Sequence, residues 1–240
     1  MLELKNVTFS YPNNDKIILN KINLKLEEGK SYAFIGPTGE GKSTLVMLMA
    51  GLIIPNEGEV LYDGKNILLI PSLANKIGYI LQDPFLYQGT ILDNIIYGNS
   101  DFKANRLFDD YATTVESLTK PKADEELEKQ LIEVLTQKEL VHLLDRFPEG
   151  LKTKVNNNSE NISLGQKQII NFLRVILRAP EFLILDEATA NLDTVTEEQL
   201  QLILDHLPET TTKVIIAHRL NTVKNVDYKY QVGGGKVELL

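Results

Sequence analysis

The first third of the chain contains short apolar stretches with the spacing of β-strands. Apolar and polar side chains alternate over residues 2–10 and again over residues 17–26, which is the period of a strand with one buried face. The turn-forming residues 11–15, Tyr-Pro-Asn-Asn-Asp, separate the two stretches. A mostly apolar stretch follows at residues 31–35. This pattern predicts an antiparallel β-layer ahead of a buried strand.

Three more apolar stretches predict buried strands at residues 77–81, 182–185 and 213–217. Polar residues follow them directly, and these are Gln82, the pair Asp186 and Glu187, and His218. In an α/β sheet the carboxyl ends of the strands border the crevice where ligands bind. We therefore expect these polar side chains to lie at one site.

Helical spacing predicts the remaining elements. A helix is expected to start at about residue 44, and another at Ser163, which has the side chain of an N-cap and is followed by a stop at Pro180. Residues 124–144 carry apolar side chains at helical spacing with charges between them, the pattern of a solvent-facing amphipathic helix. Residues 196–207 complete the set. Strands and helices in this order predict an α/β fold with a mostly helical section.

Candidate chemistry begins at residues 36–43, Gly-Pro-Thr-Gly-Glu-Gly-Lys-Ser, which match the phosphate-loop pattern G-x-x-x-x-G-K-S/T. They lie between a predicted strand and a predicted helix, as the motif requires. Glycines let successive N–H groups converge on phosphate oxygens at the positive end of the helix dipole. Lys42 can reach the β- and γ-phosphates, and the Ser43 hydroxyl can bind Mg²⁺. The alternative is a chance match, which this context makes rare.

The two carboxylates that follow the strand at 182–185 are costly to desolvate unless a metal or donors compensate. Asp186 can hold Mg²⁺ through water, and Glu187 can accept a proton from an attacking water. The alternative is an acidic pair that caps the next helix. His218 taken alone is more often structural, but it is the third polar group that follows a predicted strand and is expected at the same crevice.

Composition limits the partners and the location of this 240-residue chain. Its net charge of −8 argues against duplex nucleic acid, which needs a basic surface, and its lack of cysteine excludes disulfides and Cys-ligated zinc. The three histidines show no metal-ligand spacing. The longest apolar stretch, residues 45–54, has ten residues, whereas a membrane span needs about 20. No signal peptide begins the chain. We expect a cytosolic chain that reaches a membrane only through a partner.

Taken in order, these motifs resemble the nucleotide-binding domain of ABC transporters from Leu2 to about Leu239. Residues 36–43 resemble Walker A and residues 183–186 resemble Walker B. Tyr11 matches the aromatic position that stacks on adenine, a role that a tyrosine at a strand end would not indicate by itself. The resemblance implies ATP as ligand and nucleotide-binding residues Tyr11, Gly36, Thr38, Gly39, Glu40, Gly41, Lys42, Ser43 and Thr44.

The resemblance also implies roles in catalysis. Gln82 matches the Q-loop glutamine, which in the family touches Mg²⁺ and the attacking water. Glu187 matches the catalytic glutamate, and His218 matches the switch histidine. The implied catalytic residues are Glu187, His218, Gln82 and Lys42. The implied Mg²⁺ ligands are Ser43, Gln82 and Asp186.

Two further motifs of the family act across a dimer. Residues 162–166, Ile-Ser-Leu-Gly-Gln, stand where the family has its L-S-G-G-Q signature, and Asp193 matches the D-loop aspartate. In the family, two domains pair head to tail, and the signature of one contacts the ATP bound by the other. The implied residues acting on a partner's ATP are Ser163, Leu164, Gly165 and Gln166.

The implied fold is a P-loop NTPase core, with a mostly parallel sheet flanked by helices, an N-terminal antiparallel β-layer and an α-helical subdomain. We expect the core at about 1–82 and 180–240, and the subdomain at about 83–179. The implied activity is Mg²⁺-dependent ATP hydrolysis that drives a membrane transporter. The rival interpretations are a soluble ABC-type ATPase and a non-hydrolytic regulatory nucleotide-binding subunit.

Residues 81–91, with 93–95, resemble the exporter class, in which the segment from Gln82 to Thr90 meets coupling helices of the transmembrane domain. Expected partners are that domain and a second nucleotide-binding domain, without nucleic acid, at the cytoplasmic face of the cell membrane. Exporter domains are usually fused behind six membrane helices. We therefore expect this chain to be an excised domain or a separate subunit.

The sequence departs from the family pattern mainly in and around the signature, the motif that acts on a partner's ATP. Leu164 replaces the first of two paired glycines, Ile169 replaces an arginine, and residues 156–159 replace the usual G-E-R-G. Residues 100–122 resemble an insertion. Because the residues that act on the chain's own ATP are intact, we expect a heterodimer, with a homodimer as the alternative.

Overall fold

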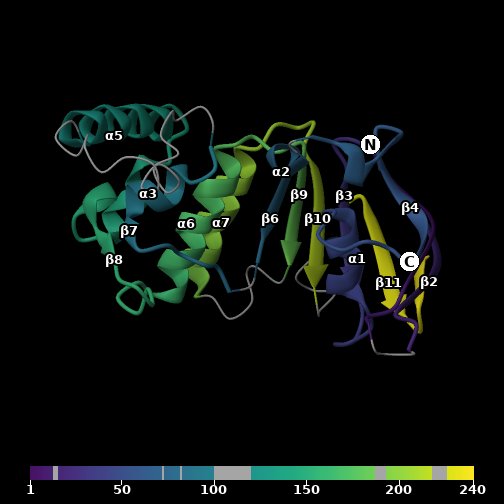
Figure 1. The fold of residues 1–240 in the computed structure, drawn as a ribbon. Coiled ribbons are helices and arrows are strands. Elements are labelled where there is room, and N and C mark those ends of the chain that lie inside the picture. The colour runs from purple at the N-terminus through teal and green to yellow at the C-terminus, as the bar shows by residue number, and fades with distance from the viewer. Residues whose placement is uncertain (13–15, 72, 82, 100–119, 187–192, 218–225) are drawn as a thin grey trace. The chain divides into compact units, whose positions relative to one another are not determined.

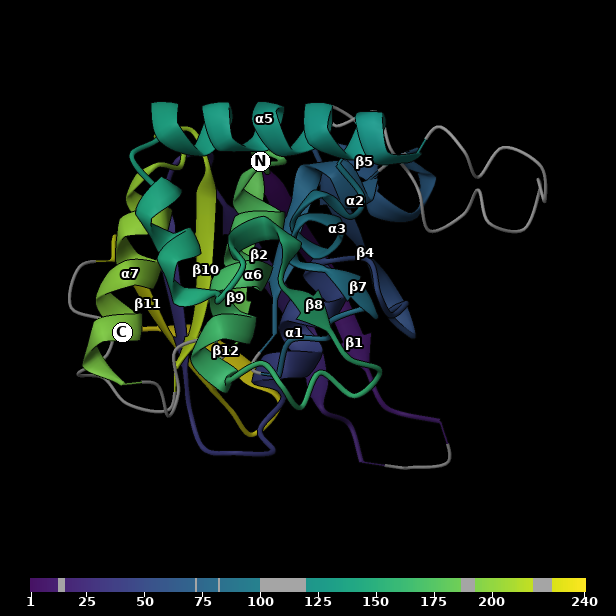
Figure 2. The ribbon, with the colours of Figure 1, turned by 90° about the vertical axis from the view of Figure 1, so that its left-hand side faces the viewer.

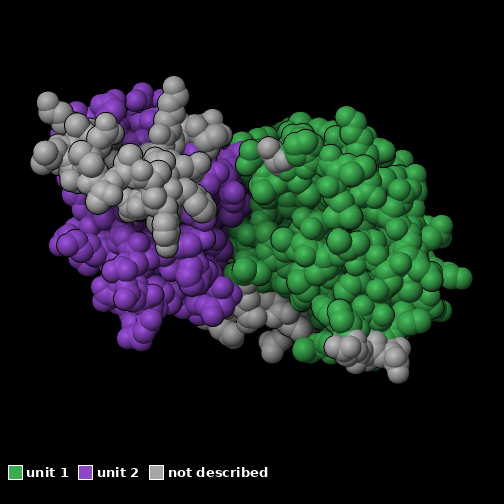
Figure 3. All heavy atoms as spheres, in the orientation of Figure 1, with its two compact units in different colours: residues 1–82, 179–190, 208–240 green, residues 83–178, 191–207 purple. Residues whose placement is uncertain are grey.

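The computed structural model describes residues 1–12, 16–71, 73–81, 83–99, 120–186, 193–217 and 226–240 (Figure 1). The chain divides into two compact units, coloured separately in Figure 3. Unit 1 comprises residues 1–82, 179–190 and 208–240, and unit 2 comprises residues 83–178 and 191–207.

Unit 1 contains a six-stranded sheet in the order β12-β11-β3-β10-β9-β6. All neighbouring strands are parallel except the terminal hairpin β11–β12. Its strands are β3 (Ser31–Ile35), β6 (Ile77–Ile80), β9 (Phe182–Asp186), β10 (Thr212–Ala217), β11 (Tyr228–Gly233) and β12 (Lys236–Leu239). Parallel strands are buried on both faces, which explains their continuous apolar runs. The predicted mostly parallel sheet is confirmed.

The predicted antiparallel β-layer is also confirmed, as a second sheet of unit 1 in the order β2-β1-β4-β5. Its strands are β1 (Leu2–Phe9), β2 (Leu19–Leu26), β4 (Glu57–Tyr62) and β5 (Lys65–Asn66). Leu2 and Leu4 alternate with more exposed residues along β1 and point to one face. That face is apolar because it packs on the interior of the unit.

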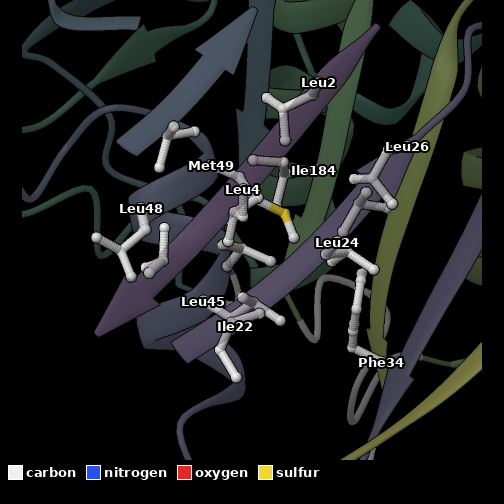
Figure 4. Close-up of a cluster of buried hydrophobic side chains, with 14 of the residues drawn as sticks. Leu2, Leu4, Ile22, Leu24, Leu26, Phe34, Leu45, Leu48, Met49 and Ile184 are labelled. Atoms are coloured by element: carbon white, nitrogen blue, oxygen red, sulfur yellow. The ribbon is translucent and has the colours of Figure 1, made fainter. Parts of the chain in front are cut away.

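Helix α1 (Lys42–Met49) lies within the core of unit 1. Figure 4 shows Leu45, Leu48 and Met49 of α1 among side chains of β1 and β2 and beside Ile184 of β9. One apolar cluster thus joins both sheets and α1. Because α1 is buried on nearly all sides, its first residue and the loop that precedes it are held in a defined place.

Unit 2 is mostly helical, and none of the described helices of the chain is both long and apolar enough to cross a membrane. The helices α6 and α7 run side by side (Figure 1 and Figure 2), and α3 packs on α6. Its helices are α3 (Ile91–Ile96), α5 (Lys120–Gln137), α6 (Leu164–Ile176) and α7 (Thr194–Asp205), and its short elements are β7 (Gly89–Thr90), β8 (Lys154–Val155), η2 (Val141–Arg146) and η3 (Gly150–Lys152).

Two details of unit 2 differ from the sequence-based expectation. The helix expected over 124–144 is divided. Helix α5 ends at Gln137, the backbone of Glu139 has a φ of +55°, and the 3-10 helix η2 follows. Residues 191–207, expected in the core, belong to unit 2, since α7 packs against α6. Most of the expected insertion at 100–122 lies outside the described residues.

A buried arginine links helix α6 to an earlier segment of unit 2. Arg174 of α6 donates to the carbonyl oxygens of Asn94 (2.7 Å) and Phe85 (3.1 Å) and to Oδ1 of Asn94 (3.0 Å). The rings of Tyr87 and Tyr97 lie 5.7 and 5.8 Å from the guanidinium carbon. Burial lowers the pKa of Arg174 to about 10, so the group stays charged at neutral pH. Arg174 therefore ties the segment after residue 83 to helix α6.

Candidate functional site

The phosphate-loop motif, residues 36–43, connects β3 to α1 in unit 1. Gly41 has a φ of +97° and directly precedes the first helical residue. A Cβ atom on Gly36 would lie 2.1 Å from the carbonyl oxygen of Val232, which no side chain could tolerate. These two glycines therefore permit a turn that side chains would block, and it directs the loop toward the N-terminus of α1.

Lys42 spans the loop. Its side chain is buried, with 4% of the residue exposed, and its ammonium group donates to the carbonyl oxygens of Gly36 and Pro37 at 2.8 Å each. A buried cation requires such acceptors. They hold the positive charge beside the loop, where an anionic ligand would meet it.

Asp186, the last residue of β9, contacts the last residue of the loop. Its Oδ1 accepts from the Ser43 hydroxyl at 3.4 Å, and its Oδ2 accepts from the Tyr79 hydroxyl at 2.9 Å. Burial, followed by the Asp186 charge, raises the pKa of Tyr79 well above its usual range, so Tyr79 remains a donor. Hydroxyl and carboxylate oxygens suit Mg²⁺, which commonly takes one or two protein ligands and fills its shell with water and phosphate oxygens. The donor set fits this ion.

Tyr79 was missed by the sequence analysis. It lies inside an apolar stretch, and only the register of β6 on β9 identifies its role. Tyr79 is paired with Ile184, so Asp186, two residues farther on, projects to the same side of the sheet.

A pocket of about 200 Å³ lies over the loop, lined by Tyr11, Ile18, Thr38, Gly39, Gly41, Lys42, Ser43 and Thr44. The Tyr11 hydroxyl lies 3.0 Å from the Thr44 hydroxyl, and the Tyr11 ring meets Phe9 edge-on. These contacts orient an aromatic ring that is 38% exposed at the pocket. Ile18 is a further lining residue that no motif indicates. Two of the expected nucleotide-binding residues, Gly36 and Glu40, do not line this pocket. Gly36 is adjacent to Val232, and the Glu40 carboxylate accepts from the Gly234 N–H.

Gln82, Glu187 and His218 lie outside the described residues. The strands that precede them, β6, β9 and β10, are consecutive in the sheet, and β10 is paired with β3. Since these strands are parallel, their carboxyl ends meet the same edge as the phosphate loop.

The start of α6 in unit 2 forms a closed capping box. The Gln166 N–H donates to the Ser163 hydroxyl at 3.2 Å, and the Ser163 N–H donates to the Gln166 side-chain oxygen at 2.8 Å. Gln166 also donates to the Arg146 carbonyl at 2.6 Å. Leu164, the first helical residue, is 42% exposed. An apolar side chain thus borders the N-terminus of this helix.

Asp193 begins the next helix, α7. Its carboxylate accepts from the backbone N–H and the hydroxyl of Thr196, at 2.9 and 2.7 Å, and these bonds lower its pKa below the usual value. A Cβ atom on Gly165 would lie 2.9 Å from the same Thr196 hydroxyl. Gly165 therefore allows α6 and α7 to approach closely at their N-termini.

Comparison with known proteins decides the family, because the family model described as ABC transporter matches residues 19–190. The chain belongs to the ABC transporter family. The ABC transporter ATP-binding protein YfiC of Bacillus subtilis is 39% identical over 94% of this chain and 34% of that protein. The fatty acid ABC transporter ATP-binding/permease protein of Mycobacterium tuberculosis is 34% identical over 98% of this chain and 34% of its own length.

A bacterial Atm1-family ABC exporter with ATP bound has a similar structure, with a TM-score of 0.77 and 28% identity over 98% of this chain and 37% of that one. The chain thus spans about a third of the length of each of these three relatives. The expected family, fold class and ATP-binding character are confirmed, and exporters are among its relatives.

In this ABC transporter domain, the position of Ile169 shows how one departure from the family pattern is accommodated. Ile169 is fully buried in unit 2, so the place of the usual arginine is occupied by a core side chain. Leu164, by contrast, remains at the surface. Of these two departures, only Leu164 therefore changes the exposed N-terminal end of α6.

Proposed function

We propose that this chain binds Mg²⁺ and ATP and hydrolyses the ATP to ADP and phosphate at the interface of two head-to-tail ABC domains. Hydrolysis drives conformational change in a membrane transporter of the exporter type. The observation that carries the proposal is the convergence of Lys42, Ser43 and Asp186 on the loop at 36–43. These groups offer a cation and metal-binding oxygens at one place.

Each residue then has a defined task. The loop amides and Lys42 bind the phosphates, and Tyr11 stacks on the adenine. Ser43 would hold Mg²⁺ directly and Asp186 would hold it through water, and the ion would neutralise charge on the phosphate oxygens. Tyr79 orients Asp186 through its hydroxyl.

In the hydrolytic step, a water oxygen forms a bond to the γ-phosphorus while the bond from that phosphorus to the β–γ bridging oxygen breaks. Glu187 accepts the proton of the water, and ADP leaves with the bonding electrons. Gln82 orients the water, and His218 donates to the γ-phosphate. The serine of a partner's signature contributes to the same charge stabilisation.

The test is Mg²⁺-dependent phosphate release by the chain assembled with its membrane part. Release that stops on chelation of Mg²⁺ supports the proposal. Nucleotide binding without release would identify a regulatory subunit instead. Full activity without any membrane partner on purification would favour a soluble ATPase.

Replacing Tyr11 tests the adenine contact. Tyr11→Ala is expected to weaken ATP binding about tenfold, because stacking of an aromatic ring on a base contributes about 1–3 kcal/mol. Tyr11→Phe should bind nearly as well as the wild type, since it keeps the ring and loses only the bond to Thr44. Calorimetric titration of the two variants gives the comparison. Equal affinity of Tyr11→Ala and wild type would exclude stacking at this position.

The segment 83–90 is the proposed contact for the coupling helices of a transmembrane domain, which would hold the chain at the cytoplasmic face of the membrane. Phe85 is 67% exposed within it, although Tyr87 and Asn94 anchor the segment from inside. Because Arg174 ties the segment to α6, a displacement there would reach the signature at the start of that helix. This connection supports transmission between the membrane and the ATP site.

We also propose that the partner ABC domain differs from this one. Leu164 places a side chain beside the N–H groups that would face a partner's γ-phosphate, whereas glycine permits close backbone approach. The site that holds this chain's own ATP would be completed by a normal signature from the partner. The second site, completed by Leu164, would bind ATP and hydrolyse it slowly. A homodimer would contain two slow sites.

Leu164→Gly is therefore expected to raise turnover at the slow site about tenfold and leave the other site unchanged. The measurement uses the full assembly with Glu187→Gln in this chain, which silences the fast site. Phosphate release with and without Leu164→Gly then reports on the slow site alone. Equal turnover at the two sites of the unmodified assembly would refute the asymmetry.

A further inference from the structure

One acidic residue stands inside the phosphate loop, but its carboxylate faces the C-terminal hairpin. Oε2 of Glu40 accepts from the Gly234 N–H at 2.8 Å. A Cβ atom on Gly233 would lie 3.7 Å from the same oxygen. The neighbours Gly39 and Gly41 line the nucleotide pocket, whereas Glu40 does not. The side chain of Glu40 therefore bonds to the turn between β11 and β12.

The geometry of this turn explains why Gly234 can donate to Glu40. Gly233 pairs with Lys236, so Gly234 and Gly235 form a two-residue turn, and their φ angles are +58° and +77°. In such turns the N–H of the first central residue has no acceptor within the hairpin. The Glu40 carboxylate supplies one, and a hydrogen bond to a charged acceptor is stronger than a neutral one.

The hairpin is itself anchored in unit 1. The Gly235 carbonyl accepts from the Asn20 N–H of β2 at 2.9 Å, and β11 pairs with β3 immediately before the loop. Gly36 packs against the Val232 carbonyl so closely that only glycine fits. The phosphate loop is thus held by one hairpin at its first residue and again at Glu40.

We propose that Glu40 is a positioning residue that fastens the phosphate loop to the β11–β12 hairpin and, by its charge, lowers the affinity for ATP. The inference rests on the proposed ATP binding. The hydrogen bond favours binding because it fixes the loop amides before the ligand arrives. The carboxylate opposes binding because Glu40 lies between Gly39 and Gly41, which line the pocket, and its negative charge repels a triphosphate.

Two variants separate these effects. Glu40→Gln keeps an acceptor oxygen for Gly234 and removes the charge, while Glu40→Ala removes both. Glu238→Gln, on the exposed surface of β12, makes the same change in net charge without touching the loop. Binding of ATP and of adenosine to the 240-residue chain is measured by calorimetry at low and high salt.

Glu40→Gln should bind ATP about threefold to tenfold more tightly than wild type and Glu238→Gln at low salt, with the difference shrinking at high salt. Glu40→Ala should bind ATP about threefold to tenfold more weakly than Glu40→Gln, the effect of one hydrogen bond. Adenosine affinity should not change, because adenosine carries no phosphate. Equal ATP affinity of the two Glu40 variants would overturn the positioning role, and equal affinity of Glu40→Gln and wild type would overturn the charge effect.

Hydrogen exchange of the Gly234 amide tests the bond without any nucleotide. Exchange should be about tenfold or more faster in Glu40→Ala than in wild type, and Glu40→Gln should stay protected. Equal rates in all three proteins would overturn the inference even if ATP binds. A wild-type chain that protects Gly234 but binds no nucleotide would instead contradict the proposed function.

Discussion

Glu187→Gln is expected to lower ATP turnover about a thousandfold while ATP binding persists. General-base catalysis contributes roughly 10²–10⁴ in rate, and glutamine cannot accept the proton of the attacking water. Asp186, the residue before it, ends β9 next to the loop at 36–43. The groups that bind nucleotide do not include Glu187, so affinity should remain.

The measurement is phosphate release under saturating ATP, beside calorimetric ATP binding. Glu198→Gln, on the exposed face of α7, is the matched control and should turn over normally. Unchanged turnover in Glu187→Gln would remove Glu187 from the role of base.

The same variant tests the proposed pairing, because an ATP complex that cannot hydrolyse its nucleotide should accumulate in the closed form of the proposed dimer. Light scattering of Glu187→Gln with Mg²⁺ and ATP gives the mass of the chain in solution. An ATP-dependent doubling would mean that Leu164 still permits closure on a γ-phosphate and would favour a homodimer. A nucleotide-bound monomer would favour an obligate partner with a normal signature.

Lys42→Met is expected to weaken ATP binding about a hundredfold. The buried ammonium group already donates to two loop carbonyls, and Lys42 lines the pocket proposed for the nucleotide. Charge-assisted hydrogen bonds contribute about 1.5–3 kcal/mol each, so losing this group removes two or more decades of affinity only if it contacts phosphate. Methionine keeps an unbranched apolar stem of similar length in the buried space.

Calorimetric titration with ATP gives the size of the effect, and thermal unfolding without nucleotide shows whether the loop remains folded. Lys25→Met, at an exposed lysine of β2, makes the same change in net charge and should bind ATP normally. If Lys42→Met binds ATP with an affinity within a few fold of wild type, the lysine does not contact phosphate and the proposed phosphate site is wrong.

The sequence by itself determined the elements whose signals are local. The strand at 31–35, the loop that follows it and the cap at Ser163 depend on neighbouring residues, and the structure has each of them where the pattern predicts. Apolar runs identified the parallel sheet, because strands buried on both faces need no alternation. Motif spacing likewise predicts that Lys42, Ser43 and Asp186 belong to one site, and the structure brings the Ser43 hydroxyl within 3.4 Å of the Asp186 carboxylate.

Tertiary structure alone decided which distant residues support that site. Tyr79 reaches Asp186 only through the register of β6 on β9, and Glu40 bonds to Gly234 only because β11 follows β3 in the sheet. The assignment of α7 to unit 2 depends on its packing against α6. Such contacts join residues far apart in the chain, so they depend on strand order and packing, which no local pattern of apolar and polar residues encodes.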